Sequence, residues 1–347
     1  MNPSIEVFGR KIGSDYLPLV IAEVGINHEG DINKAKQCID AAVEAGAECV
    51  KFQCHITDAE MIPTDMKPGK ISDERLWDII ERCALTEDEE QQIKDYCDGK
   101  GILYLCTPFS REAADRLEGL GIDAYKIGSG ECNNIPLITH IAEKKKPIIL
   151  STGMNDIHSI RKTVNIINTA GCPLMLMHCT SLYPTPYDRV RLACIQELQH
   201  EFGLPVGLSD HSIGVYTGLA AVALGACAIE KHFTVSRDWP GPDVGLSIEP
   251  HELAELVKGA RAIFQALGGR KTILAEEQPV IEFAYASVVT IKPIRKGEKF
   301  TRQNTWVKRP GTGQIRAADF DGVLGCTATR DIDAQQQLKE SDILDVP

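Results

Sequence analysis

Two histidines occupy closely matching positions late in the sequence. His211 lies within residues 209–212 and His232 within residues 230–233, and each segment follows a short apolar run typical of a buried parallel strand. A helical pattern at 215–224 separates the two runs, so we expect both imidazoles at the carboxyl ends of neighbouring strands. Two nitrogen ligands on one rim predict a site for a divalent metal ion.

Polar side chains also follow the other strand candidates, although the strands themselves are apolar. Lys51 and Lys126 each lie within a strand end, where a partly buried ammonium needs an anion. Either lysine could instead be an ordinary solvated one, but together with hydroxyl side chains they favour a cradle for phosphate and carboxylate groups. These hydroxyls belong to Thr107, Ser129, Ser151 and Ser209. Glu23 and Glu131 are candidates for catalysis or for supporting charges.

Eight strand-like segments alternate with helical patterns over the first 270 residues or so. The predicted strands are 19–24, 49–52, 102–106, 124–127, 148–151, 174–179, 206–209 and 228–231. This alternation predicts an α/β fold in which a closed (β/α)8 TIM barrel holds its functional residues at the carboxyl ends of the strands. Residues 5–16 predict a hairpin that closes the barrel floor. We expect Met154 and Met177 to belong to the core.

The pattern changes near residue 280, where short β-like segments are separated by turn signals. We therefore predict a barrel domain at 1–273, a linker at 274–282 and a small β-rich domain at 283–347. The short second domain is expected to depend on the barrel for any catalysis.

Composition narrows the function classes. The net charge of −12 argues against a general nucleic-acid binder, and no apolar run is long enough to span a membrane. Residues 1–10 lack the pattern of a secretion signal, and the twelve cysteines follow no disulfide framework. We expect buried thiols in a cytoplasmic protein with small-molecule substrates.

An ordered set of motifs resembles those of the bacterial sialic acid (N-acetylneuraminate) synthases. The matching segments are 22–30, 51–53, 107–109, 126–131, 150–154, 178–184, 208–211, 230–234 and 241–243. Residues 308–311 resemble the motif of that family's C-terminal antifreeze-like (SAF, β-clip) domain. Any one tripeptide is a weak signal, whereas the ordered series covers nearly the whole chain.

The resemblance implies a metal-dependent condensation of phosphoenolpyruvate with N-acetylmannosamine or a related N-acylated hexose, giving a nine-carbon sialic acid and phosphate. The implied metal is Mn²⁺, with Mg²⁺ or Co²⁺ as alternatives. The implied assembly is a domain-swapped homodimer, in which the antifreeze-like domain of one chain covers the barrel mouth of the other.

Site residues carry over onto matching positions of this sequence. His211 and His232 would hold the metal, Glu23 would handle the attacking water, and Glu131 and Tyr183 would act beside the sugar. Phosphoenolpyruvate would be bound by Lys51, Thr107, Lys126, Ser129, Ser151, Ser181 and Ser209. The sugar would contact Gln53, Asp243 and, from the partner chain, Arg309.

Two regions depart from the family pattern and leave the acceptor sugar open. Val244 stands where many members have histidine, and 56–76 lacks the usual segment. A 2,4-diacetamido-6-deoxyhexose, giving a legionaminate or pseudaminate, is therefore a rival acceptor. Two other classes remain: a Schiff-base aldolase using Lys126 or Lys231, and a sugar-binding protein without catalysis.

Overall fold

The computed structural model describes residues 2–69 and 72–344. The chain divides into two compact units, Met1–Gly268 and Gly269–Pro347. Within the described ranges, no helix combines the length and apolar character needed to cross a membrane.

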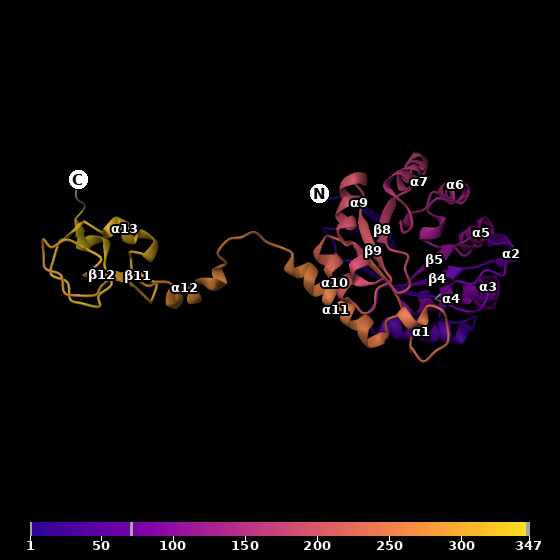
Figure 1. The fold of residues 1–347 in the computed structure, drawn as a ribbon, viewed down its shortest axis with the longest axis horizontal. Coiled ribbons are helices and arrows are strands. Elements are labelled where there is room, and N and C mark those ends of the chain that lie inside the picture. Colours follow the sequence, from indigo (N-terminus) through magenta and orange to yellow (C-terminus); the bar gives the residue numbers. More distant parts are fainter. Residues whose placement is uncertain (1, 70–71, 345–347) are drawn as a thin grey trace. The chain divides into compact units, whose positions relative to one another are not determined.

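The first unit is built around eight parallel strands that close into a barrel (Figure 1). Each strand pairs with the next along the chain, and β10 pairs with β3 to close the ring. The strands are β3 (Leu19–Gly25), β4 (Cys49–Cys54), β5 (Leu103–Pro108), β6 (Tyr125–Ile127), β7 (Ile148–Ser151), β8 (Leu174–Cys179), β9 (Val206–Asp210) and β10 (Ala228–His232). The predicted (β/α)8 barrel is confirmed.

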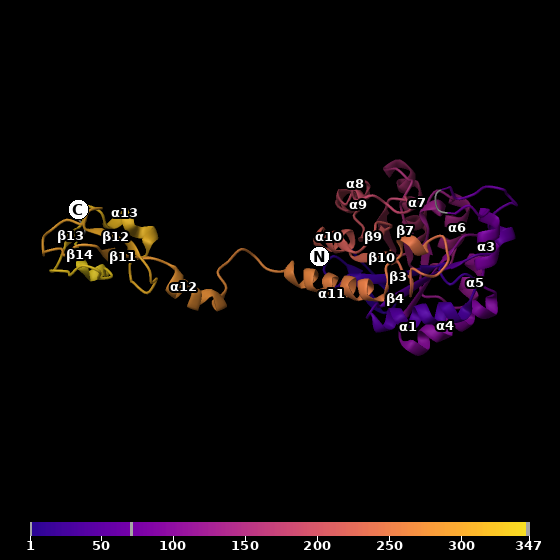
Figure 2. The same ribbon diagram turned by 60° about the horizontal axis from the view of Figure 1, so that its bottom comes forward.

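Helices surround the barrel (Figure 2), and most of them bury apolar residues against it. They are α1 (Ile32–Glu44), α2 (Thr57–Glu60), α3 (Leu76–Cys83), α4 (Glu87–Lys100), α5 (Arg111–Gly119), α6 (Ile135–Glu143), α7 (Ile157–Ala170), α8 (Tyr187–Val190), α9 (Ala193–Phe202), α10 (Tyr216–Ala223) and α11 (Pro250–Ala266). Local sequence sets several ends. Thr86 and Glu89 form a reciprocal capping box at the start of α4, because each side chain accepts from the other's backbone N–H.

The barrel interior is apolar at its floor and polar at its mouth. Because strand side chains alternate between faces, Leu19 and Ile21 of β3 point into the same interior as Glu23. The floor layer packs on the hairpin of β1 (Ser4–Val7) and β2 (Arg10–Gly13). Hairpin residues Ile5 and Val7 join that cluster. The predicted floor hairpin is thus confirmed. Because the floor of the barrel is filled with apolar side chains, the polar groups that could carry out chemistry lie at the opposite end.

The second unit has its own small core of buried apolar side chains, among them Val288, Phe300 and Leu338. Its elements are α12 (Gln278–Ala284), β11 (Ser287–Thr290), β12 (Thr305–Lys308), α13 (Phe320–Val323), β13 (Thr327–Ala328) and β14 (Ile343–Leu344). The strands form two antiparallel pairs, β11 with β12 and β13 with β14. This confirms a small β-rich domain.

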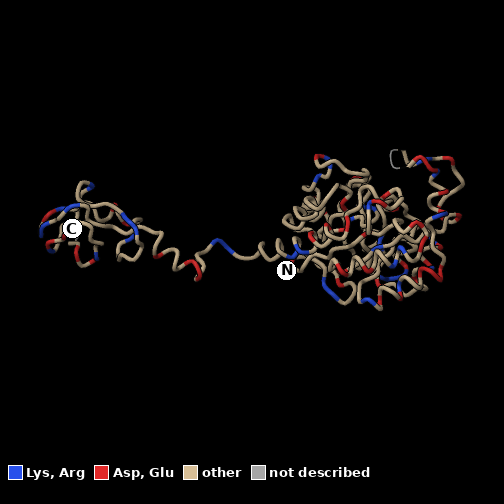
Figure 3. Tube along the Cα trace, turned by 90° about the horizontal axis from the view of Figure 1, so that it is seen from below, with Lys and Arg blue, Asp and Glu red and all other residues tan. Residues whose placement is uncertain are grey.

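The boundary between the two units lies before the predicted linker, because the second unit begins at Gly269. Helix α12 begins inside the predicted linker range 274–282 and ends two residues after it. The Gly311 N–H donates to Glu282 O at 2.7 Å, so α12 is tied to the small domain. Acidic and basic residues are interspersed in both units (Figure 3).

Candidate active site

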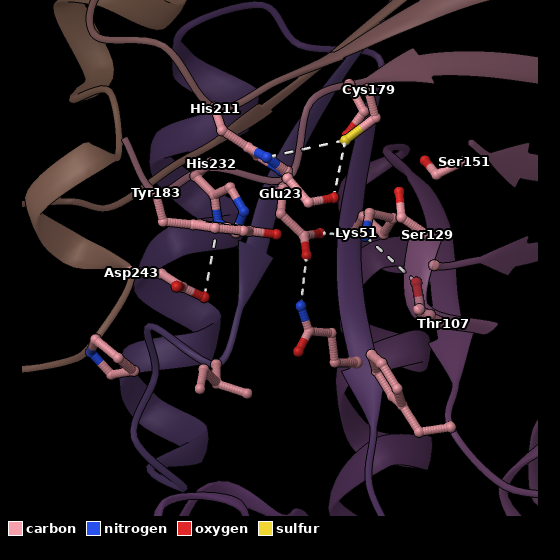
Figure 4. Close-up of a pocket in the computed structure, with 18 of the residues that line it drawn as sticks. Glu23, Lys51, Thr107, Ser129, Ser151, Cys179, Tyr183, His211, His232 and Asp243 are labelled. Carbon is pink, nitrogen blue, oxygen red and sulfur yellow. Dashed lines mark hydrogen bonds and ion pairs between the residues drawn. The ribbon is translucent and has the colours of Figure 1, made fainter. Parts of the chain in front are cut away.

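A cavity of about 450 Å³ opens at the carboxyl ends of the barrel strands. All eight strands, or the turns that follow them, contribute lining side chains. The cavity brings together every predicted site residue of the first unit except Glu131. Figure 4 shows His211, His232 and Tyr183 on one side, Lys51 and Thr107 on the other, and Glu23 between them.

Two buried lysines and two buried carboxylates meet in the cavity floor. The Lys51 ammonium lies 2.8 Å from Glu23 Oε2 and 3.6 Å from Glu230 Oε1. The Lys126 ammonium lies 3.1 Å from the Glu230 carboxylate. All four side chains are at most 6% exposed. Two positive and two negative charges therefore compensate one another at a depth where an unpaired charge would be costly.

The environment tunes these groups differently. Burial raises the pKa of Glu23, against the lowering effect of Lys51. For Glu230 the two lysines overcome the effect of burial and lower the pKa to about 2. Burial lowers the pKa of Lys126, whereas two flanking carboxylates raise that of Lys51 despite its burial. Of the two carboxylates, Glu230 is therefore the one that the lysines hold in its charged form, and Glu23 is the one that accepts a proton more readily.

Hydroxyl groups surround a small open space beside the lysines. Lys51 donates to Thr107 Oγ1 at 3.3 Å, and the Gly153 N–H donates to Ser129 Oγ at 3.0 Å. A Cβ on Gly153 would collide with Ser181 Oγ and lie 2.8 Å from Ser129 Oγ. Glycine here keeps the space between these hydroxyls open, as an anion cradle requires.

The two histidines meet as predicted from their strand ends. β9 and β10 are paired neighbours, and the His211 and His232 ring centroids are 5.3 Å apart. Tyr183 stacks on His211 with its ring centroid 4.2 Å away. His211 Nδ1 contacts Thr180 O at 3.1 Å, which leaves Nε2 of this ring for a ligand.

The residues present fit a divalent metal ion. His232 Nδ1 is buried and has no hydrogen-bond partner among the described residues, and Asp243 Oδ2 lies 3.9 Å away. Burial, reinforced by nearby His211, lowers the pKa of His232, which keeps the imidazole in the neutral form that ligates metals. Burial also raises the pKa of Asp243 to about 6. The two imidazoles thus offer the nitrogen ligands that divalent transition metals accept.

Two predicted residues are not among the side chains that line the barrel cavity: Glu131 of the first unit and Arg309 of the second. Glu131, at the end of η1 (Ser129–Glu131), does not line the cavity and accepts from Asn134 Nδ2 at 2.5 Å. Arg309 is exposed in the second unit, directly after β12.

The alternative Schiff-base lysine Lys231 faces away from the cavity. Its ammonium lies 2.9 Å from Asp210 Oδ2 and also donates to Ser212 O, and it does not line the cavity. Strand alternation explains this placement, because Glu230 and His232 point inward and the residue between them must point outward. Of the two lysines considered for an aldolase, Lys126 is therefore the one that lines the cavity.

Several lining residues were missed from sequence. Glu230 shares the inward face of β10 with His232, a signal that the two-residue period carried. Cys179 has the same relation to Met177 on β8, and His55 follows β4 directly. The core prediction was right for Met177 but wrong for Met154. Met154 is 72% exposed and lines the cavity mouth from a left-handed turn with φ 61°.

The segment after β4, where the sequence departs from the family pattern, forms part of the cavity wall. Pro68 and Leu76 lie in that segment, and Ile79 and Ile80 of α3 follow it. Ile26 and Phe109 add to the same apolar lining. Val244, the second departure, is buried at the start of η2 (Val244–Leu246), next to the lining residue Asp243.

A family model described as the NeuB family matches residues 38–272, and an SAF domain model matches residues 285–344. The chain belongs to the NeuB family. The predicted resemblance and the prediction of a synthase-type enzyme are thereby confirmed.

Named relatives of this NeuB-family chain refine the comparison. The N,N'-diacetyllegionaminic acid synthase of Campylobacter jejuni is 39% identical, over 93% of this chain and 99% of the relative. The enzyme of the same name from Legionella pneumophila is 34% identical, over 93% of both chains. A crystal structure of N-acetylneuraminic acid synthetase from Leptospira borgpetersenii is 35% identical, with a TM-score of 0.74 over 81% of this chain and 96% of the other.

Proposed function

We propose that this protein condenses phosphoenolpyruvate with an N-acylated hexose to give a nonulosonate and inorganic phosphate. The observation that carries the proposal is the joining of two features in one cavity: a buried lysine pair lined by hydroxyls, and a histidine pair beside Asp243. The first suits a small dianionic or trianionic substrate, and the second suits a metal that acts on a carbonyl.

Phosphoenolpyruvate would occupy the lysine side of the cavity. Lys51 and Lys126 would bind its phosphate and carboxylate, with help from the hydroxyls of Thr107, Ser129, Ser151, Ser181 and Ser209. Ser151 Oγ is buried without a hydrogen-bond partner among the described residues, as a group that waits for a ligand would be. Binding would draw both ammonium groups partly from Glu230 to the substrate.

The acceptor aldehyde would lie on the histidine side. A divalent cation held by His211 and His232 would supply Lewis-acid polarisation of the aldehyde oxygen. Carbon 3 of the enol forms a bond to the aldehyde carbon, and the positive charge left on carbon 2 is stabilised by the Glu23 and Glu230 carboxylates. Water then adds to carbon 2 and gives one proton to Glu23, and the alkoxide formed from the aldehyde oxygen takes up a proton in turn. The bond from carbon 2 to the phosphate oxygen breaks as the new hydroxyl on carbon 2 becomes the ketone and passes its proton to the departing phosphate.

For the acceptor, we propose a 2,4-diacetamido-6-deoxyhexose in preference to N-acetylmannosamine. The wall formed by Ile26, Leu76, Ile79, Ile80 and Phe109 presents hydrocarbon to the cavity. The methyl groups of two acetamides and of carbon 6 can pack against such a wall, whereas the extra hydroxyls of N-acetylmannosamine would lose their hydrogen bonds there. The two relatives named N,N'-diacetyllegionaminic acid synthase support this choice.

The remaining expectations form part of the proposal. Mn²⁺ is the proposed metal, the protein is proposed to act in the cytoplasm, and the assembly is proposed to be a domain-swapped homodimer. Buried free thiols such as Cys38, Cys49 and Cys97 support a reducing compartment.

The test is to incubate the protein with phosphoenolpyruvate, Mn²⁺ and three acceptors in parallel: N-acetylmannosamine, its 6-phosphate and a 2,4-diacetamido-6-deoxyhexose. We expect phosphate release together with a nine-carbon product, with the highest kcat/KM for the diacetamido sugar. Preference for N-acetylmannosamine would contradict the acceptor, and no condensation with any sugar would contradict the reaction. Borohydride trapping of Lys126 with pyruvate in the absence of metal would favour the aldolase instead.

A further inference from the structure

His55 is a buried histidine that the proposed reaction does not use. It follows β4 directly and is 3% exposed. Its ring stacks on Phe109, with centroids 4.5 Å apart and planes 13° from parallel. His55 Nδ1 lies 2.9 Å from Glu60 Oε2, and Nε2 lies 3.1 Å from Gln53 Oε1. Stacking and two hydrogen bonds thus hold this ring at both nitrogens.

Gln53 lies between His55 and Glu23, and its contacts with these two residues fix which way its amide points. The Gln53 Nε2 group donates to Glu23 Oε1 at 2.8 Å, because a carboxylate can only accept. The Gln53 amide oxygen must then face His55, and this oxygen accepts a hydrogen bond from His55 Nε2. A Cβ on Gly25 would lie 3.1 Å from both Gln53 Nε2 and Glu23 Oε1, so glycine leaves room for this bond.

The network has a direction, from the segment after β4 into the reacting site. Glu60 is the last residue of α2, and its side chain is 5% exposed at its contact with His55. The contacts run from Glu60 through His55 and Gln53 to Glu23, whose other oxygen meets Lys51 at 2.8 Å. His55 and Gln53 are the inner members, so removing either one interrupts the contacts that reach Glu23 Oε1 and leaves this carboxylate held by Lys51 alone.

We propose that His55 is a positioning residue for the reaction, which acts through Gln53 to hold the Glu23 carboxylate in the orientation that receives the proton of the attacking water. This rests on the proposed function, which gives Glu23 that proton. Without the His55 donor, the Gln53 amide oxygen loses its partner, and the side chain is free to move away from Glu23. The carboxylate then loses its fixed hydrogen bond while phosphoenolpyruvate keeps its lysines.

A double-mutant cycle on kcat tests this. His55→Phe keeps an aromatic ring against Phe109 and removes the donor to Gln53, and Gln53→Met keeps the side-chain length and removes the amide. We expect each single change to lower kcat about ten- to a hundredfold, the range for a hydrogen bond to a charged group, with the KM for phosphoenolpyruvate near wild type. In the Gln53→Met background, His55→Phe should cost almost nothing more.

A matched control is His178, also buried, whose Nε2 contacts Val190 O at 2.8 Å and which does not line the cavity. His178→Phe should combine additively with Gln53→Met. If His55→Phe is unfolded because Glu60 is left without a partner, His55→Phe/Glu60→Leu takes its place in the cycle.

The outcomes separate the two ideas. Two results would overturn the positioning role and leave the proposed function standing. One is an additive loss of kcat in His55→Phe/Gln53→Met, and the other is a change in KM for phosphoenolpyruvate with kcat unchanged. A wild-type protein without turnover on any acceptor would overturn the proposed function and, with it, the role of His55.

Discussion

The Lys126 ammonium lies 3.1 Å from both carboxylate oxygens of Glu230 across the barrel. β6 and β10 are four strands apart in the closed order of eight, so this ion pair spans the interior. The contact joins residues 104 positions apart in the sequence. Burial lowers the pKa of Lys126, the Glu230 carboxylate opposes that effect, and the contact can be exchanged for a substrate anion.

Replacing Lys126 should therefore affect substrate use strongly. We expect Lys126→Ala to lower kcat/KM for phosphoenolpyruvate at least about 30-fold, since a charge-assisted contact in a desolvated site contributes on the order of 2–4 kcal/mol. Steady-state kinetics with varied phosphoenolpyruvate would measure it.

Lys231 offers a matched control, because it is equally buried and paired with Asp210 outside the cavity. Lys231→Ala should destabilise the fold by about 3–5 kcal/mol by leaving Asp210 unpaired, with kinetic constants of the folded fraction preserved. Near-normal kinetics for Lys126→Ala would show that its ammonium does not bind substrate.

The histidine pair predicts metal dependence. His211→Ala or His232→Ala should abolish turnover and sharply weaken Mn²⁺ binding, because each variant removes one of two nitrogen ligands. Calorimetric or paramagnetic-resonance titration with Mn²⁺ alone measures this without reference to activity, and circular dichroism checks the fold. Unchanged Mn²⁺ affinity in both variants would remove these residues from the metal site.

His28 predicts a pH dependence of stability. Burial lowers its pKa to about 4, its Nδ1 accepts from the Gly30 N–H, and its Nε2 is buried without a hydrogen-bond partner among the described residues. Between about pH 6.5 and pH 4 the unfolded chain binds a proton that the folded chain does not. Stability should therefore fall as pH falls through this window, by about 3 kcal/mol in total at 1.36 kcal/mol per pH unit.

Urea unfolding of wild type and His28→Gln between pH 4.5 and 7.5 isolates the contribution of His28 to the unfolding free energy, because the other titrating groups are common to both proteins. The difference in unfolding free energy should change by close to 1.36 kcal/mol per pH unit below about pH 6. Parallel curves for the two proteins would mean that folding does not change the pKa of His28.

Strand ends were predictable from sequence because an apolar run that stops at a polar residue marks the barrel mouth, as at Lys51 and His232. The ion pair across the barrel was not predictable, because no local pattern links Lys126 to Glu230, which lie 104 positions apart. Strand alternation could have placed Glu230 inward and Lys231 outward. The core prediction for Met154 was wrong because this residue lies in a left-handed turn, which breaks the periodicity on which a core prediction rests.

The last prediction concerns Arg309, which is exposed on a well-anchored turn of the small domain. Pro310 O accepts hydrogen bonds from Ser287 Oγ at 2.8 Å and Gln337 Nε2 at 2.9 Å, so the turn is held while the guanidinium stays accessible. A guanidinium suits the hydroxyl or carbonyl oxygens of a sugar. In the proposed domain-swapped dimer this arginine would serve the partner's barrel, so Arg309→Ala should lose sugar turnover while Mn²⁺ binding persists.

Complementation distinguishes a swapped dimer from a self-capped chain. After subunit exchange of Arg309→Ala with His211→Ala, half of the dimers are mixed, and each has one barrel with both histidines and an intact arginine from the other chain. Activity should recover to about a quarter of wild type, because one of two sites works in half of the dimers. In a self-capped arrangement every site lacks either His211 or Arg309, so no mixture can be active. Absence of recovery, with exchange verified by differently tagged chains, would therefore count against the swap.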